Sequence, residues 1–349
     1  MEQKRKTSFS TGQYKKRTVV GKTIILAGEV FLLLSVTALM LFASEIFLRW
    51  HYRGVLSSAH GITYFHNHSL KKFIHERNAL GLRGKHFEVG KRNAFRIVVL
   101  GDSLAYGQGV YPYEKRFPEQ AEKLFKEQHP DLDVEFINTG IAGQDLRQHN
   151  KYLASFVLKL KPDFVLYQWY INDMNTTYHL SEVTTPPLIS NRKLHASLME
   201  NSVLYFLLQQ SWSQIRVKMG TQKKYSDYLV EKFIDSTSVP SIAAKEQLNK
   251  LLDRLKKENI AYGIVLFPSF ATPMREYTLG FLHERVLNTC TKRNIVCLDL
   301  RDTYMEYDSH IKALWANVFD PHPSELAHRL AAEKIVAAYG DQWAKMATK

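Results

Sequence analysis

The stretch RIVVLGDSLAYGQGV, Arg96–Val110, decides the fold of this chain. Its first five residues are rich in β-branched side chains and predict a short buried strand. The Gly-Asp-Ser that follows predicts a tight turn, because these residues tolerate turn dihedrals and hydrogen-bond to nearby backbone groups. The turn would expose Ser103 at the carboxyl end of the strand, which is where ligands and chemistry collect in open α/β sheets.

Strands and helices alternate along the chain from this point on. The strand patterns are Arg96–Leu100, Val134–Asn138, Phe164–Tyr170, Tyr262–Phe267 and Ile295–Leu298, and the helical patterns are Pro118–Gln128, Leu146–Leu160, Ile242–Glu258, Arg275–Lys292 and Glu325–Tyr339. Helices of this length between strands imply right-handed crossovers and a mainly parallel sheet with helices on both faces. We therefore predict a three-layer α/β/α (flavodoxin-like) domain with a mainly parallel five-stranded sheet.

The composition is that of a folded protein, and much of the charge excess lies outside the predicted sheet. The 349 residues are 45% hydrophobic and 12% aromatic, which suffices for one large or two ordinary domains. The net charge is +13, and much of the excess precedes the first apolar run, at Lys4, Arg5, Lys6, Lys15, Lys16, Arg17 and Lys22. The remainder contains no nucleic-acid-binding module, so we expect no nucleic-acid partner.

Residues 23–48 form an apolar run that is long enough to cross a bilayer, which needs about 20 residues. Glu29 and Glu45 interrupt it near its ends, and the apolar residues outweigh their cost. A buried core helix is one alternative, and a cleaved signal peptide ending near Phe42-Ala43-Ser44 is another. The basic residues before the run predict a single-pass anchor with a cytoplasmic N-terminus, so everything after Trp50 would be periplasmic or extracellular.

We divide the chain into a basic cytoplasmic tail (1–22), a transmembrane anchor (23–48), a stalk (49–93) and a folded domain (94–349) with an insertion (174–241). The insertion contains an aromatic-rich helical stretch, Ser197–Met219. That stretch is either a helix packed on the domain or a lid over the substrate site. The stalk histidines lack the spacing of a metal site, and we predict none there: His51, His60, His66, His68, His75 and His86.

The two cysteines, Cys290 and Cys297, leave two alternatives open. In an oxidising compartment a disulfide between them would persist. They are otherwise two small buried side chains, because only geometry decides whether they can be bridged. At this spacing, without histidine partners nearby, they do not make a zinc site.

Three further segments add to the pattern that Gly101-Asp102-Ser103 begins. They are NTGIAG at Asn138–Gly143, YIND at Tyr170–Asp173 and DPHPS at Asp320–Ser324. Together the four segments resemble the blocks of the SGNH hydrolases, also called the GDSL esterase/lipase family, over about Arg96 to Ala338.

The resemblance implies that Ser103 is a nucleophile and His322 its base. A serine hydroxyl is a poor nucleophile unless a base removes its proton, and histidine titrates in the useful range. Asp320 would accept a hydrogen bond from the other ring nitrogen of His322. In the family the acid often lies three residues before the histidine, and here it lies two before, so Asp299 and Asp302 are alternatives.

The resemblance also implies an oxyanion hole, formed by the backbone N–H groups of Ser103 and Gly143 and the side-chain amide of Asn172. The family commonly has a glycine two residues before this asparagine, where this chain has Tyr170, which alters the expected shape of the pocket. His328, further along the final helix, is expected on the helix surface.

We therefore expect a membrane-anchored serine esterase or deacylase, for which an O-acylated envelope polysaccharide is a candidate substrate. The loop Asn78–Gly84 is similar to a lead-in of membrane-anchored members of the family. Neither a metal nor an organic cofactor is called for. An O-acyltransferase acting on a glycan hydroxyl is one alternative, and a non-catalytic envelope protein that binds glycan or serves as a scaffold is another. The ester, the acyl length and the oligomeric state are not predicted.

Overall fold

Five parallel strands form the central sheet of the structure, a computed structural model that describes residues 11–53, 76–90, 94–174 and 182–348. The strands are β1 (Phe95–Leu100), β2 (Val134–Asn138), β3 (Phe164–Trp169), β4 (Ala261–Leu266) and β5 (Cys297–Asp299). Their order is β2-β1-β3-β4-β5. Ile97 of β1 pairs with Phe136 of β2 and with Phe164 of β3. The Gly-Asp-Ser turn therefore follows a strand that has a neighbouring strand on each side.

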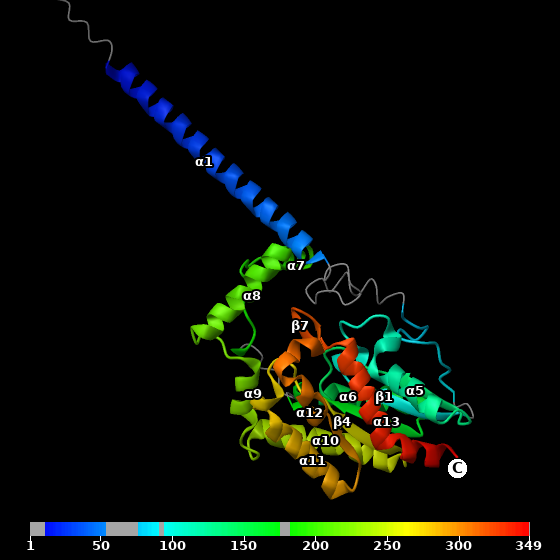
Figure 1. The fold of residues 1–349 in the computed structure, drawn as a ribbon. Coiled ribbons are helices and arrows are strands. Elements are labelled where there is room, and N and C mark those ends of the chain that lie inside the picture. Colours follow the sequence, from blue (N-terminus) through cyan, green and yellow to red (C-terminus); the bar gives the residue numbers. More distant parts are fainter. Residues whose placement is uncertain (1–10, 54–75, 91–93, 175–181, 349) are drawn as a thin grey trace, which may run out of the picture.

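Helices cover both faces of this sheet (Figure 1). One face packs on α5 (Phe117–Gln128) and α13 (Glu325–Ala347), and the other packs on α6 (Leu146–Ser155), α10 (Val239–Lys257) and α11 (Gly280–Arg293). Successive strand side chains point to opposite faces. Ile97 and Val99 therefore join one core, and Val98 and Leu100 join the other. The prediction of a three-layer α/β/α fold with a five-stranded parallel sheet is confirmed.

Shorter elements connect these layers. They are the helices α4 (Ser103–Tyr106) and α12 (Arg301–Tyr304), the antiparallel strands β6 (Trp315–Asn317) and β7 (Asp320–Pro323), and the 3₁₀ helices η2 (Tyr113–Lys115), η3 (Val157–Leu160), η4 (Ile171–Met174), η6 (Met274–Glu276) and η7 (Met305–Leu314). The helix predicted at Leu146–Leu160 thus divides into α6 and η3. The helix predicted at Arg275–Lys292 begins later, at Gly280.

The N-terminal helix α1 (Thr11–His51) projects away from the sheet (Figure 1). Its segment Ile24–His51 is long and apolar enough to cross a membrane, and its apolar window is not buried against the protein. The helix begins at Thr11, so it extends into the stretch that we assigned to the basic tail.

In the described part of the insertion, from residue 182 on, the helices before α10 are α7 (Arg192–Asn201), α8 (Val203–Lys218) and α9 (Tyr225–Phe233). The prediction of one continuous helix over Ser197–Met219 is wrong, because the chain is extended at Ser202. The Ser202 hydroxyl instead caps α8 by accepting a hydrogen bond from the Tyr205 backbone N–H at 3.1 Å. Side chains of α9 pack into the core between the sheet and the helices α6, α10 and α11. In contrast, α8 contacts the end of α1.

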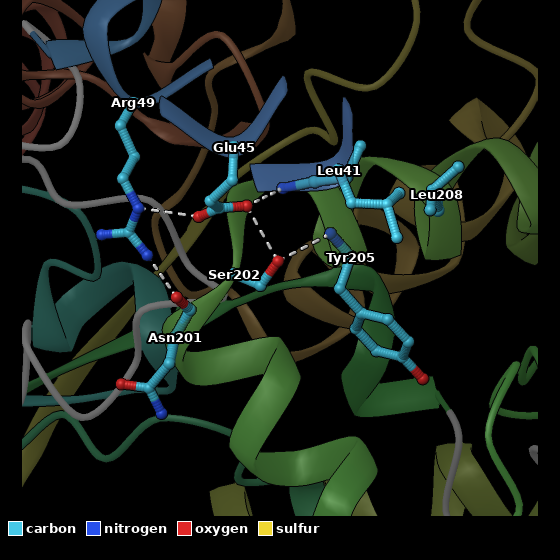
Figure 2. Close-up of a pocket in the computed structure, with 8 residues that line it drawn as sticks. Leu41, Glu45, Arg49, Asn201, Ser202, Tyr205 and Leu208 are labelled. Carbon is cyan, nitrogen blue, oxygen red and sulfur yellow. Dashed lines mark hydrogen bonds and ion pairs between the residues drawn. The ribbon is translucent and has the colours of Figure 1, made fainter. Parts of the chain in front are cut away.

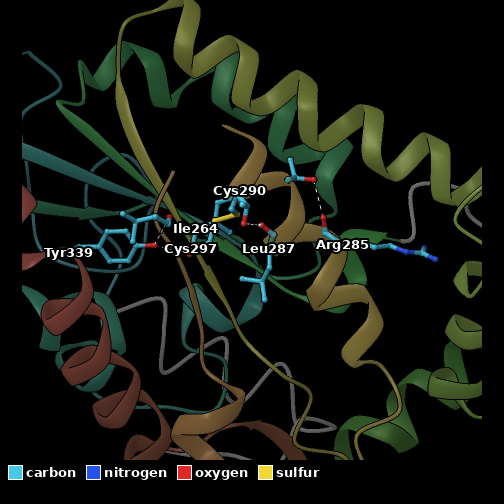
Figure 3. The surroundings of a disulfide bond; sticks show 9 residues. Ile264, Arg285, Leu287, Cys290, Cys297 and Tyr339 are labelled. Atoms are coloured by element: carbon cyan, nitrogen blue, oxygen red, sulfur yellow. Dashed lines mark hydrogen bonds between the residues drawn. A yellow bond between two sulfur atoms is a disulfide. The ribbon is translucent and has the colours of Figure 1, made fainter. Parts of the chain in front are cut away.

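Cys290 and Cys297 form a disulfide, so the structure holds the first of the two alternatives (Figure 3). The bond joins α11 to β5, a strand at the edge of the sheet. Cys297 also pairs with Ile264 of β4. The disulfide therefore fixes the last crossover helix to the strand that follows it.

Candidate active site

Ser103 is the first residue of α4, immediately after the turn that ends β1. Asp102 caps this helix, and its Oδ1 accepts a hydrogen bond from the Leu104 backbone N–H at 2.9 Å. The Oε1 atom of Gln168 on β3 accepts from two further N–H groups of the turn, at 3.0 and 3.3 Å. A Cβ at Gly101 would collide with the Gln168 side chain, so the turn requires glycine there. These hydrogen bonds hold the backbone of the turn, and Ser103 is 8% exposed.

The antiparallel pair β6–β7 carries His322 to this serine. The Nε2 atom of His322 lies 3.0 Å from Ser103 Oγ, and its Nδ1 atom lies 2.6 Å from Asp320 Oδ1. The same carboxylate oxygen accepts a hydrogen bond from the His322 backbone N–H at 3.1 Å. When Nδ1–H donates to Asp320, Nε2 is left to accept the proton of the serine hydroxyl.

Charged neighbours set the protonation of this cluster. Burial alone would lower the pKa of His322, but the hydrogen bond and charge of Asp320 outweigh it and raise that pKa above its ordinary value. Burial and the nearby Asp173 carboxylate raise the pKa of Asp102 to about 6. The carboxylates of Asp320 and Asp102 therefore favour the charged form of the imidazole, against the effect of burial.

Besides Ser103, the residues expected to form the oxyanion hole are Gly143, which follows β2, and Asn172, which follows β3. Gly143 has a φ of 80°, and the space where a Cβ would lie is open. Asn172 lies in η4, and its Nδ2 donates to Asp102 Oδ2 at 2.8 Å and to the Gln144 carbonyl at 3.3 Å. Both N–H bonds of this amide are thus directed at protein acceptors, and a substrate oxygen would have to replace the longer contact.

The alternative acids lie elsewhere. Asp299 accepts hydrogen bonds from Arg301 and pairs with His283 Nδ1 at 3.1 Å, and Asp302 is exposed on α12. Of the three carboxylates considered, Asp320 is the one that contacts His322.

The expectation that His328 lies on a helix surface is wrong. Its side chain is fully buried in α13, and its Nδ1 accepts a hydrogen bond from the Phe117 backbone N–H at 3.2 Å. Burial, together with nearby positive charge, lowers the pKa of His328 to about 3. His328 is buried because α13 packs on both the sheet and α5. The buried face of this helix is therefore wider than the apolar positions in its sequence indicate.

Two supporting residues were missed in the sequence. Gln168 lies within the predicted strand Phe164–Tyr170, where a lone amide among apolar residues indicates a buried hydrogen-bonding role. Arg83, in the loop Asn78–Gly84, is buried and donates to the carbonyl oxygens of Tyr106 and Gly107 at 3.0 and 2.8 Å. These hydrogen bonds connect the end of α4 to the loop Asn78–Gly84.

No group of three or more metal-ligating side chains occurs among the residues that the structure describes. His51 and His86 are exposed, and the other stalk histidines, His60, His66, His68 and His75, lie outside the described residues.

The chain is similar to several known proteins. The model of the GDSL-like lipase/acylhydrolase family matches residues 97–335. Among solved structures, a member of the lipolytic G-D-S-L family from Veillonella parvula DSM 2008 is 18% identical, with 70% of this chain and 98% of that chain covered and a TM-score of 0.43. A catalytic mutant of an acetylxylan esterase from Geobacillus stearothermophilus is 17% identical, with 71% and 95% covered and a TM-score of 0.44. No curated protein matches the chain.

Proposed function

Because the chain belongs to the GDSL-like lipase/acylhydrolase family and is an ester-hydrolysing serine hydrolase, we propose that Ser103, His322 and Asp320 carry its reaction. The observation that supports this assignment best is the pair of contacts that His322 makes, 3.0 Å to Ser103 Oγ and 2.6 Å to Asp320 Oδ1.

In this mechanism, Ser103 Oγ attacks the ester carbonyl while His322 Nε2 takes its proton. The protonated imidazole then gives that proton to the leaving alcohol, and an acyl-serine remains. His322 next removes a proton from water, which attacks the acyl carbonyl. The imidazole then returns that proton to Ser103 Oγ as the bond between the acyl group and the serine breaks and the acid leaves. Asp320 holds the imidazole in the required tautomer and stabilises its positive charge.

The backbone N–H groups of Ser103 and Gly143 and the amide of Asn172 are the donors that we assign to the developing oxyanion. Each such donor is worth about 10²- to 10³-fold in rate. For Asn172 this role requires the amide to exchange its 3.3 Å contact with the Gln144 carbonyl for the substrate oxygen.

We further propose that α1 is an uncleaved anchor that leaves the catalytic domain on the outer side of the membrane. Leu41 of α1 lines a cavity together with Leu204 and Leu208 of α8, a contact that a cleaved leader would not keep. At that location an O-acylated envelope polysaccharide is the substrate class that we propose, with hydrolysis of its acyl groups as the reaction.

The test is an activity screen of the full chain in detergent against short-chain aryl esters and acetylated glycans, beside Ser103→Ala and His322→Ala. We expect hydrolysis that both substitutions abolish. A parallel reaction with a sugar acceptor separates transfer from hydrolysis, because a transferase would form acylated sugar and release little free acid. A folded wild-type chain that reacts with none of these esters would contradict the proposal.

A further inference from the structure

The end of α1 is joined to the start of α8 by a set of polar contacts (Figure 2). The carboxylate of Glu45 on α1 accepts hydrogen bonds from the Ser202 hydroxyl and from the backbone N–H groups of Val203 and Leu204, at 2.9 to 3.0 Å. Arg49 donates to Glu45 at 2.7 Å and also to the carbonyl of Asn201. A carboxylate on the free N–H groups of a helix N-terminus is a favourable partner. The first turn of α8 is thus fastened to α1.

The length of α1 places this junction at the membrane boundary. Counted from Ile24, the roughly 20 residues that span a hydrocarbon core reach about Ala43. Glu45 comes just beyond that point. Trp50 follows and is 59% exposed, with the guanidinium of Arg53 over its ring. Tryptophan and arginine at a helix end are typical of the headgroup layer. The start of α8 therefore lies at headgroup depth.

One side of α8 is mostly apolar and exposed, and Ser211 is the exposed polar residue on it. Leu204, Leu208, Ile215 and Met219 follow one another at intervals of four, seven and four residues, which places them on one face. Leu208, Ile215 and Met219 are 49%, 46% and 67% exposed. Leu204 and Leu208 share a cavity of about 330 Å³ with Leu41 of the apolar span, so this face is continuous with the surface that α1 presents to lipid.

The opposite side of α8 faces the protein. Val203, Phe206 and Gln209 are buried, and the Phe206 ring lies 5.5 Å from that of Phe319. Phe319 directly precedes Asp320. Arg216 and Lys218, near the end of α8, add positive charge that suits anionic headgroups. Figure 1 shows α8 turning away from the axis of α1 instead of continuing along it.

We propose that α8 is an interfacial helix, with the face formed by Leu204, Leu208, Ile215 and Met219 immersed in the outer leaflet beside α1. This inference rests on the proposed anchoring by α1. It makes the phospholipid surface a second partner of the catalytic domain. Through Phe206 and Phe319 it also holds the β6–β7 pair, and with it His322, close to the membrane surface.

The test uses single cysteines on the full chain, each labelled with the environment-sensitive fluorophore NBD. The two native cysteines are bonded to each other, so only the introduced thiol reacts. The label is placed at Leu208→Cys, at Ile215→Cys and, as a matched control, at Gln210→Cys, which is exposed on another face of α8. Leu34→Cys in α1 reports on anchoring. The chains are reconstituted into vesicles of phosphatidylcholine and phosphatidylglycerol, with or without nitroxide-bearing lipid.

We expect blue-shifted emission at positions 208, 215 and 34 and loss of that emission with nitroxide lipid, with little change at position 210. Quenching at 34 without quenching at 208 and 215 would overturn the inference and leave the anchor intact. Absence of quenching at all four positions would overturn both the anchor and the inference. Ester hydrolysis by each labelled chain, measured in parallel, reports separately on the proposed reaction.

Discussion

Asp320→Asn removes the negative charge beside His322 with almost no change in side-chain volume. The contact between His322 Nδ1 and Asp320 Oδ1 is 2.6 Å, the length of a strong hydrogen bond assisted by charge. An asparagine there would no longer favour the required tautomer or stabilise the imidazolium. Loss of both effects in a serine triad costs about 10⁴-fold in kcat, or about 5.5 kcal/mol of barrier.

The assay is kcat/KM on a short-chain aryl ester, with thermal unfolding to confirm that each variant is folded. Asp299→Asn and Asp302→Asn are the matched controls, since Asp299 ends β5, Asp302 follows on α12, and neither contacts His322. We expect both controls to hydrolyse the ester at rates near that of the wild type. The reasoning is refuted if folded Asp320→Asn retains activity within about tenfold, or if either control loses its activity instead.

Three other outcomes follow from the structure. Because the pKa of His322 is raised and its neutral form is the base, kcat/KM should rise with pH through an inflection above 6.5; an inflection at or below that value would contradict the Asp320 contact. His328 has a pKa of about 3 in the folded chain, so the unfolded chain binds the extra proton below pH 6.5. His328 should therefore lower the stability measured by urea unfolding as pH drops from 6.5 toward 3, with a contribution from this one group of at most about 1.4 kcal/mol per pH unit. His328→Gln should have a correspondingly shallower slope than the wild type; an equal slope in the variant would be evidence against it. Replacing Cys290 and Cys297 together by Ser should lower the free energy of unfolding by about 2.5 kcal/mol and leave ester hydrolysis unchanged, because the disulfide closes a short loop away from Ser103; unchanged stability or lost activity in the folded variant would contradict this.

The sheet could be predicted because its strands are short, buried and separated by regular helices. β1 is buried along its whole length. The apolar run in the sequence and the strand in the structure therefore end at the same residue, Leu100, just before the Gly-Asp-Ser turn. The same turn places Ser103, and the segment at Asp320 brings His322 to it. The resemblance of four sequence segments to one family therefore selected residues that the structure brings together.

Contacts between distant segments could not be predicted in this way. Glu45 reads as a cost of membrane insertion, yet in the structure it caps a helix that starts at Val203. His328 reads as a surface residue, because helical periodicity gives no sign that α13 is covered on two sides. Ser202, whose extended backbone divides the predicted helix in the insertion, likewise has a distant partner, because its hydroxyl donates to Glu45.

The covalent reactivity of Ser103 tests the account most directly. The full chain is incubated with a fluorophosphonate probe, which reacts with activated serines, and the modified peptide is identified by mass spectrometry. The account predicts a phosphonate adduct on Ser103 that is strongly reduced in His322→Ala. A folded chain that hydrolyses esters while its adduct lies on another serine, or one in which Ser103 stays unmodified, would contradict it.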